Sequence, residues 1–308
     1  MKSNSEILFR GLSVQTFTTA VLAVIEIAYF AIMSRLLTKT DFGYFASLTG
    51  ILSVFMSLSE AGLGAAIVQK KSDSDSYVST TFSLSLILGA LGSIAVLIFA
   101  PAISRIIVDD TLIIPLRIMS FTILLHSLNS CGTALLQRTL AFKKIGVVSI
   151  VSQMLAYSVA IIMAYKGFGL YAVVTSTVLL SVFSFLTVYI FFVKFPKLRI
   201  NKKEISSIVS FGGWLTASTI TNNIMQQVDK LLLPKWLSVQ QLGSYNRPSG
   251  FISTISTKIN SIFDSVLFPM LSQIQDEINR VQSVFCRAIE LLNSFSAILG
   301  CAFFFNAD

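Results

Sequence analysis

Charged residues are scarce in this chain: Asp, Glu, Lys and Arg make up 12% of its 308 residues, whereas hydrophobic residues make up 54%. The mean hydropathy is +0.77. A soluble domain of this size needs a mostly polar surface and has no place for so many apolar side chains. A lipid bilayer accommodates them, because helices satisfy their own backbone hydrogen bonds there. The composition therefore excludes a soluble globular protein and predicts an all-α, polytopic transmembrane helical bundle.

Residues and motifs of common catalytic sites are also few, with one His and three Cys in the whole sequence. It contains no Gly-rich phosphate loop with its Lys, no Cys or His pair at metal-ligand spacing and no G-x-S-x-G elbow. We therefore expect no cofactor, no metal and no enzymatic activity. Cys131, Cys286 and Cys301 are expected to pack as small apolar residues. His126 is expected to pack too, although an intramembrane His also serves in proton relays.

Long apolar stretches alternate with short polar turns along the whole chain. A helix needs ~20 apolar residues to cross the hydrocarbon core, and about nine stretches reach that length. They lie near residues 7–36, 42–68, 77–107, 112–136, 145–166, 168–193, 205–233, 242–270 and 282–305. The first stretch is too long for a signal peptide and is predicted to be a retained helix.

Lys and Arg fall mainly in alternate turns, and positive loops of membrane proteins stay in the cytoplasm. The larger set comprises Lys2, Arg10, Lys70, Lys71, Arg138, Lys143, Lys144, Lys194, Lys197, Arg199, Lys202, Lys203, Arg280 and Arg287. The smaller set comprises Arg35, Lys39, Arg105, Arg117, Lys166, Lys230 and Lys235. This bias predicts a cytoplasmic N-terminus and accounts for most of the net charge of +8. No nucleic-acid partner is needed to explain it.

An internal repeat relates two parts of the chain at an offset of 200 residues. It needs no gap, and it keeps both the polar positions and the glycine of a helix-connecting turn. The matched pairs are Thr16/Thr216, Thr19/Thr219, Glu26/Gln226, Leu37/Leu237, Thr38/Ser238, Phe42/Leu242, Gly43/Gly243, Thr49/Ser249, Gly50/Gly250, Ser53/Ser253 and Ser57/Thr257. Six predicted spans separate the copies, so both halves should have the same orientation, as in parallel-repeat transporters.

The repeat predicts a domain division. Residues 1–203 would form a six-helix N-terminal bundle, and residues 204–308 the first three or so helices of a second bundle. A second half of that length is expected to be truncated relative to a complete transporter.

Polar residues within the predicted spans indicate a hydrated cavity between the two halves, because ionisable groups in a membrane normally face a bundle interior or water. Arg247 and Lys258 are about three helical turns apart and share a face; such cations would attract an anionic headgroup, and Arg binds phosphate through two hydrogen bonds. The candidate substrate pathway is Arg247, Lys258, Asn222, Gln226 and Asn260. The candidates for ion or proton coupling are Glu26, Glu60 and Asp264. The alternative is that such groups pair with neighbours or reach an interface.

Several motifs resemble one family over essentially the whole chain. They are LLTKTDFG (36–43), EAGLGAAIVQKK (60–71), LLQRTLAFKK (135–144), FGGWLTAS (211–218), VDKLLLPKW (228–236), LGSYNRPSGF (242–251) and VLFPMLSQIQDE (266–277). In order and spacing, the chain resembles bacterial oligosaccharide flippases, or polysaccharide exporters, of lipopolysaccharide, colanic or teichuronic acid type. They belong to the superfamily that includes MATE transporters. The family often has Pro where this chain has Lys39, and Arg247 matches a recurring family position.

The resemblance implies two helical bundles around a central cationic cavity with alternating access. The implied cargo is a glycan on an undecaprenyl pyrophosphate carrier, exported across the inner membrane, with a glycan polymerase and other assembly proteins as further partners. Two alternatives stay open. One is a MATE-like drug or cation antiporter, which predicts an acidic cavity. The other is a non-transporting enzyme or subunit of glycan assembly.

Overall fold

The computed structural model describes most of the first 206 residues and part of the remaining chain. The described residues are 4–60, 62–69, 75–107, 110–206, 208, 221, 225, 232–233, 236–253, 282–283, 286, 289–290 and 293–294. The chain divides into two compact units, Met1–Ile255 and Ser256–Asp308. In the second unit, the described residues from 282 to 294 are helical.

The first unit is built from helices joined by short turns. In chain order these are α1 (Asn4–Leu36), α2 (Lys39–Glu60), α3 (Leu63–Gln69), α4 (Asp75–Ile107), η1 (Asp110–Leu112), α5 (Ile113–Arg138), α6 (Phe142–Tyr165), α7 (Leu170–Thr187) and the π-helix η2 (Val188–Phe192). Residues 239–253 are helical as well.

Six segments of the described chain are long and apolar enough to cross a membrane: Ser13–Leu36, Lys39–Val68, Asp75–Arg105, Asp110–Arg138, Phe142–Tyr165 and Leu170–Phe192. They confirm the first six predicted spans and the all-α transmembrane fold. The spans predicted near 205–233, 242–270 and 282–305 lie largely outside the described residues. So does much of the chain beyond the domain boundary predicted at residue 203, and that boundary stays a prediction.

The predicted span 42–68 is divided into two helices at Gly62. This residue adopts a φ of +62°, in the left-handed region that glycine enters without steric cost. Its carbonyl then accepts the amide of Ala66 at 3.1 Å, in the first turn of α3. Apolar composition alone does not reveal this break, since the residues on both sides have the same character.

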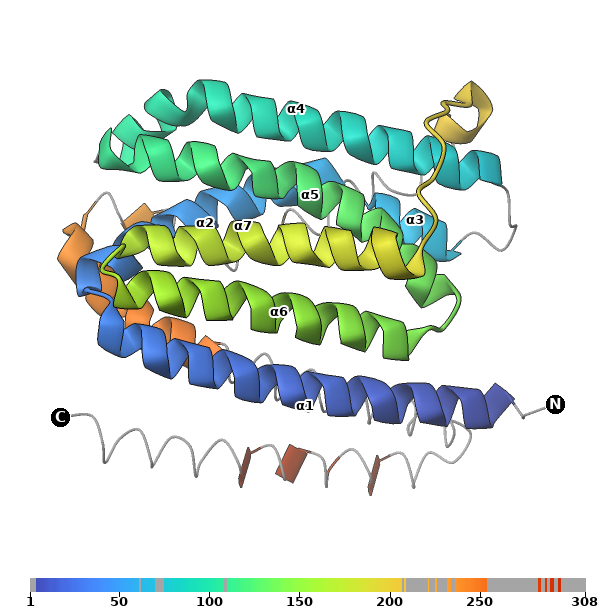
Figure 1. Ribbon diagram of the computed structural model, residues 1–308, viewed down its shortest axis with the longest axis horizontal. Coiled ribbons are helices and arrows are strands. Elements are labelled where there is room, and N and C mark those ends of the chain that lie inside the picture. Colours follow the sequence, from blue (N-terminus) through green and yellow to red (C-terminus); the bar gives the residue numbers. More distant parts are fainter. Residues whose placement is uncertain are drawn as a thin grey trace. The chain divides into compact units, whose positions relative to one another are not determined.

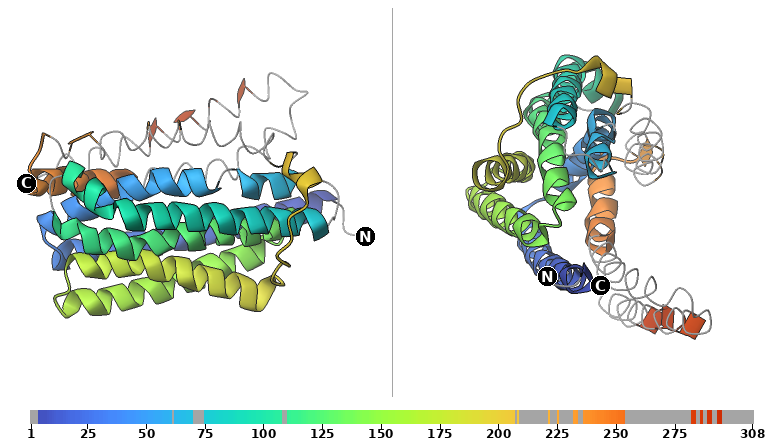
Figure 2. Two further views of the ribbon diagram at one scale, coloured as in Figure 1. Left: turned by 90° about the horizontal axis from the view of Figure 1, so that it is seen from above. Right: turned by 90° about the vertical axis from the view of Figure 1, so that its right-hand side faces the viewer.

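Successive long helices run in opposite directions, and their axes lie nearly parallel (Figure 1). Helix α5 packs against α2, α3, α4 and α7, while α6 packs against α7 and α1. In chain order the alternation brings the end of α3, the start of α4, the 138–142 turn and the residues after η2 to one end of the bundle (Figure 2). The opposite end carries the connections 36–39 and 165–170, together with the end of α4 and the start of α5.

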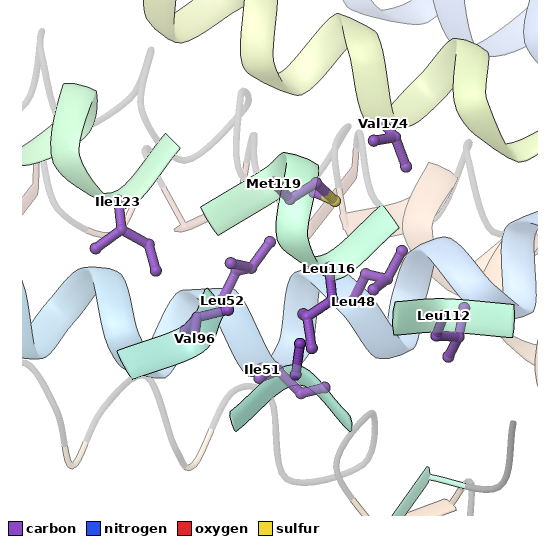
Figure 3. Packing of buried hydrophobic residues seen from close by; sticks show 10 residues of the cluster. Leu48, Ile51, Leu52, Val96, Leu112, Leu116, Met119, Ile123 and Val174 are labelled. Carbon is purple, nitrogen blue, oxygen red and sulfur yellow. The ribbon is translucent and has the colours of Figure 1, made fainter. Parts of the chain in front are cut away.

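A buried apolar cluster joins α2, α4, η1, α5 and α7. Its residues are Leu48, Ile51, Leu52, Val96, Ala100, Leu112, Leu116, Met119, Ile123 and Val174 (Figure 3). On the outside of the same bundle, large apolar side chains are exposed, such as Val24 at 68% and Ile98 at 66%. Apolar residues on both the inner and outer faces are typical of helices whose surroundings are lipid.

Small residues set the distance between the helices around α4. Ser127 Oγ of α5 donates to the carbonyls of Ser85 at 2.7 Å and Ser59 at 3.2 Å, so one hydroxyl joins three helices. Gly89 and Gly92 of α4 face α5 and α2 at this place. Because lipid gives apolar helices no hydrophobic drive to associate, close packing of small residues and interhelical hydrogen bonds hold them together.

Asp41 stabilises the start of two helices. Its Oδ2 accepts the Thr38 amide at 3.0 Å, and its own amide donates to Thr38 Oγ1 at 3.2 Å, which forms a capping box at the start of α2. Its Oδ1 accepts the amide of Leu170, the first residue of α7, at 3.0 Å. A carboxylate at two helix N-termini also compensates both helix dipoles.

We expect Gly89→Val to destabilise the bundle. A Cβ at this position would lie 2.9 Å from Ser127 Cβ and 3.2 Å from Leu124 Cα, and neither atom can move without shifting α5. The expected loss is about 1–3 kcal/mol, as for overpacking elsewhere, measured as a lower melting temperature of the purified chain in detergent. Leu91→Val, at a position of α4 that is 59% exposed, is the control. Equal melting temperatures of the two variants would contradict the proposed packing.

Candidate functional site

A cavity of about 340 Å³ lies between α1, α2, α6, α7 and the helical residues 239–253. Its lining combines aromatic rings with hydroxyl, amide and carboxylate groups. Glu26 is the one charged side chain among the described lining residues. The lining comprises Glu26, Tyr29, Phe30, Met33, Phe42, Phe45, Ala46, Thr49, Tyr157, Val173, Ser176, Thr177, Leu180, Asn246, Gly250 and Ser253.

A hydrogen-bonded chain of side chains borders this cavity, and its Glu26, Tyr29 and Tyr157 line it. Gln153 Nε2 of α6 donates to Glu26 Oε1 of α1 at 2.7 Å and contacts the Tyr157 hydroxyl at 3.0 Å. Tyr157 stacks on Tyr29, with ring centroids 3.8 Å apart and planes within 10°. The Tyr29 hydroxyl in turn donates to Ser176 Oγ of α7 at 3.1 Å. The network therefore fixes the Glu26 carboxylate and two aromatic faces at the junction of α1, α6 and α7.

Two amide oxygens near the cavity have no hydrogen-bond partner in the described part of the chain: Gln153 Oε1 and Asn246 Oδ1. Asn246 is 7% exposed, and its Nδ2 donates to the Leu242 carbonyl at 2.9 Å, so its orientation is fixed. Buried polar atoms are normally hydrogen-bonded, and a ligand hydroxyl is a suitable donor for such an oxygen. Asn246 thus lines the cavity and has an amide oxygen that can accept a hydrogen bond from a ligand.

Arg247 caps the C-terminal end of α1. Its Nη2 donates to the Ser34 carbonyl, and its guanidinium lies 5.7 Å from the centre of the Phe42 ring. The Ser34 carbonyl belongs to the last turn of α1, and the Thr38 amide four residues later donates to Asp41 instead. Carbonyls at a helix C-terminus lack intrahelical donors, and cations are favoured there. Arg247 therefore links α1 to the helical residues 239–253 at one end of the cavity.

The glycines matched by the repeat contact each other. A Cβ on Gly43 would lie 3.1 Å from the Gly243 amide nitrogen, and a Cβ on Gly243 would lie 3.2 Å from that of Gly43. The caps correspond as well, because Ser238 and Gln241 exchange hydrogen bonds of 2.9 and 3.3 Å, as Thr38 and Asp41 do in α2. Two helix starts that the repeat pairs in sequence are thus paired in space.

Glu60, a predicted coupling residue, lies at the end of α2, and Ser130 Oγ of α5 donates to its carboxylate at 2.7 Å. It is not among the residues that line the cavity. The cavity meets α2 several turns earlier, at Phe42, Phe45, Ala46 and Thr49. A coupling role for Glu60 stays a prediction.

Five predicted site residues lie outside the described residues: Asn222, Gln226, Lys258, Asn260 and Asp264. Their roles stay predictions. The cationic cavity that the resemblance implies stays a prediction, because Lys258 is not described and the described lining contains Glu26 but not Arg247. Cys131 is fully buried beside Phe82 and Leu128, in accord with a packing role.

Tyr29, Gln153 and Tyr157 were not predicted as site residues from the sequence. One signal was available: Gln153 and Tyr157 are four residues apart in α6, and Glu26 and Tyr29 are three apart in α1, so each pair shares a helix face. Nothing in the sequence indicated that α1 and α6 would bring these two faces together.

A family model described as "Polysaccharide biosynthesis protein" matches residues 32–308. The chain belongs to this family. The Teichuronic acid biosynthesis protein TuaB of Bacillus subtilis (strain 168) is 23% identical over 97% of this chain and 63% of its own length. Lipopolysaccharide biosynthesis protein WzxC of Escherichia coli (strain K12) is 23% identical over 94% and 60%.

The Succinoglycan biosynthesis transport protein ExoT of Rhizobium meliloti (strain 1021) is also 23% identical, over 81% of this chain and 50% of its own length. The chain thus spans between 50% and 63% of these three relatives. Among solved structures, an inward-facing multidrug resistance MATE family transporter of the MOP superfamily matches with a TM-score of 0.63. It is 13% identical and covers 91% of this chain and 70% of its own. This likeness shows a transporter fold.

We expect Gly243→Ala to weaken the contact between α2 and residues 239–253. The added Cβ would press on the backbone carbonyl group of Lys39, which cannot rotate away. The expected loss is about 1 kcal/mol or more, measured by thermal unfolding in detergent. Gly250→Ala is the matched control, since its Cβ would meet Phe30 Cε2 at 3.9 Å, an ordinary contact. This control should be neutral or should stabilise the chain by roughly 0.5 kcal/mol. A larger loss of stability in Gly250→Ala than in Gly243→Ala would refute the close contact between α2 and residues 239–253.

Proposed function

We propose that this chain takes part in moving a lipid-linked oligosaccharide, carried on undecaprenyl pyrophosphate, across the bacterial cytoplasmic membrane during cell-surface polysaccharide biosynthesis. The observation that carries the proposal is a transporter fold in a chain of the polysaccharide biosynthesis family, with a polar cavity where repeat-related helices meet. The similarity to TuaB, WzxC and ExoT, which are named for polysaccharide biosynthesis and in one case for transport, supports it.

The chemistry of the cavity suits a sugar. Sugars present hydroxyl groups at their edges and C–H groups on their faces, so they bind between aromatic rings and hydrogen-bonding side chains. The stacked Tyr29 and Tyr157 supply ring faces, while Glu26, Ser176 and Asn246 supply hydrogen-bonding groups in the same lining. A concave, largely apolar site with a few converging polar groups is the usual form of a small-molecule site.

In an alternating-access cycle, the contact between Arg247 and the Ser34 carbonyl would help to close one end of the cavity. Opening that end requires Arg247 to leave the Ser34 carbonyl. A pyrophosphate in the cavity would be a stronger acceptor for the guanidinium than a neutral carbonyl, because hydrogen bonds between two charged groups are the stronger kind. We infer that cargo binding and release of this contact are coupled, with Arg247 exchanging one oxygen partner for another.

The predicted orientation places the N-terminus in the cytoplasm. The alternating helices support it, since they bring the basic turn at 138–144 and the basic residues of 194–203 to one end of the bundle (Figure 2). Positive residues remain on the cytoplasmic side. In this proposal the chain transports rather than catalyses, and a glycan polymerase and other assembly proteins act on the exported unit.

A drug or cation antiporter on the same fold is the second candidate. The observation in its favour is that Glu26 is the charged group of the described cavity lining. Efflux of a cationic dye that depends on Glu26, with normal surface polysaccharide, would support this candidate.

Deletion of the gene in its native host tests the proposed function. We expect carrier-linked oligosaccharide to accumulate in the inner leaflet and surface polysaccharide to disappear, with both restored by the wild-type gene. Accumulation of unpolymerised units in the outer leaflet would instead indicate a polymerase or assembly subunit. Unchanged surface polysaccharide would refute a role in export.

Replacing Glu26 with Gln tests the cavity. The amide keeps the size of the side chain but removes the charge that accepts the Gln153 hydrogen bond. A hydrogen bond to a charged group contributes about 2 kcal/mol, so we expect at least about a tenfold loss of export at unchanged protein level. Asp110→Asn removes the same charge from the exposed residue that begins η1 and should export normally. Wild-type export by Glu26→Gln would exclude Glu26 from the mechanism.

A further inference from the structure

A second cavity, of about 590 Å³, lies at the end of the bundle where α4 begins and α5 ends. None of its described lining residues lines the cavity around Glu26. Among these described residues four side chains are cationic, and Asp75 alone is acidic. The cations are Arg138, Lys194, Lys197 and Arg199. This wall is strongly positive, and two of its cations are the residue type that binds phosphate through paired hydrogen bonds.

Hydrogen bonds hold the outer wall of this cavity in place. The extended residues after η2 lie across the start of α4, where Ser83 Oγ donates to the Arg199 carbonyl at 3.2 Å. The Asn201 amide donates to Thr80 Oγ1, and its side chain donates to Ser76 Oγ, both at 3.1 Å. The backbone that carries Lys194, Lys197 and Arg199 is therefore fixed before any ligand binds.

Aromatic packing fixes the same segment from the other side. The Phe195 ring lies 5.0 Å from the ring of Phe82 in an edge-to-face arrangement, and 5.3 Å from that of Tyr189. Phe82 is 1% exposed, so Phe195 is anchored to the core of the bundle. Lys194 and Lys197, on either side of Phe195, are exposed and line the cavity. Their backbone is held in place by the packing of Phe195.

Large apolar side chains are exposed next to these cations. Phe191 is 73% exposed, Leu198 is 61% and Ile200 is 53%. The cavity lies where the membrane-spanning part of α7 and η2 ends, at Phe192. A ligand with a negative head and apolar chains would satisfy both surfaces at once, with its head among the cations and its chains along the outer face.

We propose that this cavity binds the phosphate group of an anionic membrane lipid at the headgroup level of the bilayer. Basic pockets between transmembrane helices recognise anionic lipid headgroups in this way. A soluble phosphate would use the cations but not the apolar residues beside them. Because the lipid would contact α4, α5 and the residues after η2 together, it would tie the end of the first six spans to the bundle.

The test uses the purified chain in neutral detergent, titrated with dioleoyl-phosphatidylglycerol, dioleoyl-phosphatidylcholine or inorganic phosphate. Binding is measured by native mass spectrometry and by the shift in melting temperature. We expect saturable binding of phosphatidylglycerol that phosphatidylcholine does not match. The triple variant Arg138→Gln, Lys197→Gln and Arg199→Gln should weaken that binding at least about tenfold, since each cation contributes to the attraction.

A charge-matched control separates a built site from general attraction to a basic surface. Lys143→Gln, Lys202→Gln and Lys203→Gln remove three exposed cations at the same end that do not line the cavity. Their combined change should leave phosphatidylglycerol affinity within about twofold of wild type. Equal loss in both triple variants would overturn the proposal, and so would binding of inorganic phosphate as tight as that of the lipid.

A second variant guards against loss of folding, since Arg138 is half-buried. Lys194→Gln with Lys197→Gln changes two exposed side chains only. We expect this pair to keep the melting temperature of the lipid-free chain and to weaken phosphatidylglycerol binding by roughly fivefold or more. Unchanged lipid affinity in this folded variant would also overturn the proposal.

Discussion

Close approach of helices at small residues is the interaction on which the rest of this structure depends. Apolar side chains gain little by leaving lipid for a protein interior, so the outer faces of α1 and α4 keep their large residues exposed. The bundle holds together where Gly, Ser and Thr allow backbones to meet and hydroxyls to bridge them, as Ser127 does between three helices. The cavity around Glu26 lies elsewhere in the bundle, between α1, α2, α6, α7 and residues 239–253.

Polar side chains inside this bundle fall into two groups, which differ in whether their hydrogen-bond partner lies in the same helix or in another one. Many hydroxyls of the described helices bond to a carbonyl three or four residues earlier in their own helix, as Thr81 does to Tyr77 at 2.8 Å and Ser57 to Ser53 at 2.7 Å. These bonds satisfy the side chain within its helix. The cavity wall is different, because its Glu26 and Tyr29 make hydrogen bonds to other helices, to Gln153 of α6 and Ser176 of α7. A binding surface in a membrane protein is therefore marked by the partner of each polar group, more than by the number of polar groups.

The sequence predicted the helices and the repeat well, because both leave a direct mark on composition and spacing. Stretches of apolar residues identified the six spans, and the pairing of Gly43 with Gly243 in sequence anticipated their contact in space. The break at Gly62 was missed, since it depends on the backbone conformation of one residue. The cavity was predicted only in part. Glu26 stands out as a charge within an apolar stretch, whereas Gln153 and Tyr157 acquire their meaning from the packing of α6 on α1.

The contact between Gly43 and Gly243 bears on how an internal repeat of this kind can arise. Each glycine meets the start of the other's helix, so the patch is self-complementary, like the isologous face of a symmetric dimer. A gene duplication that fused two identical subunits would inherit such a face ready-made, with one residue serving on both sides. After such a fusion the codons of the two positions would mutate independently. A larger side chain at either position would nevertheless clash with the other copy. The two copies of the repeat therefore limit each other's side-chain size within a single polypeptide.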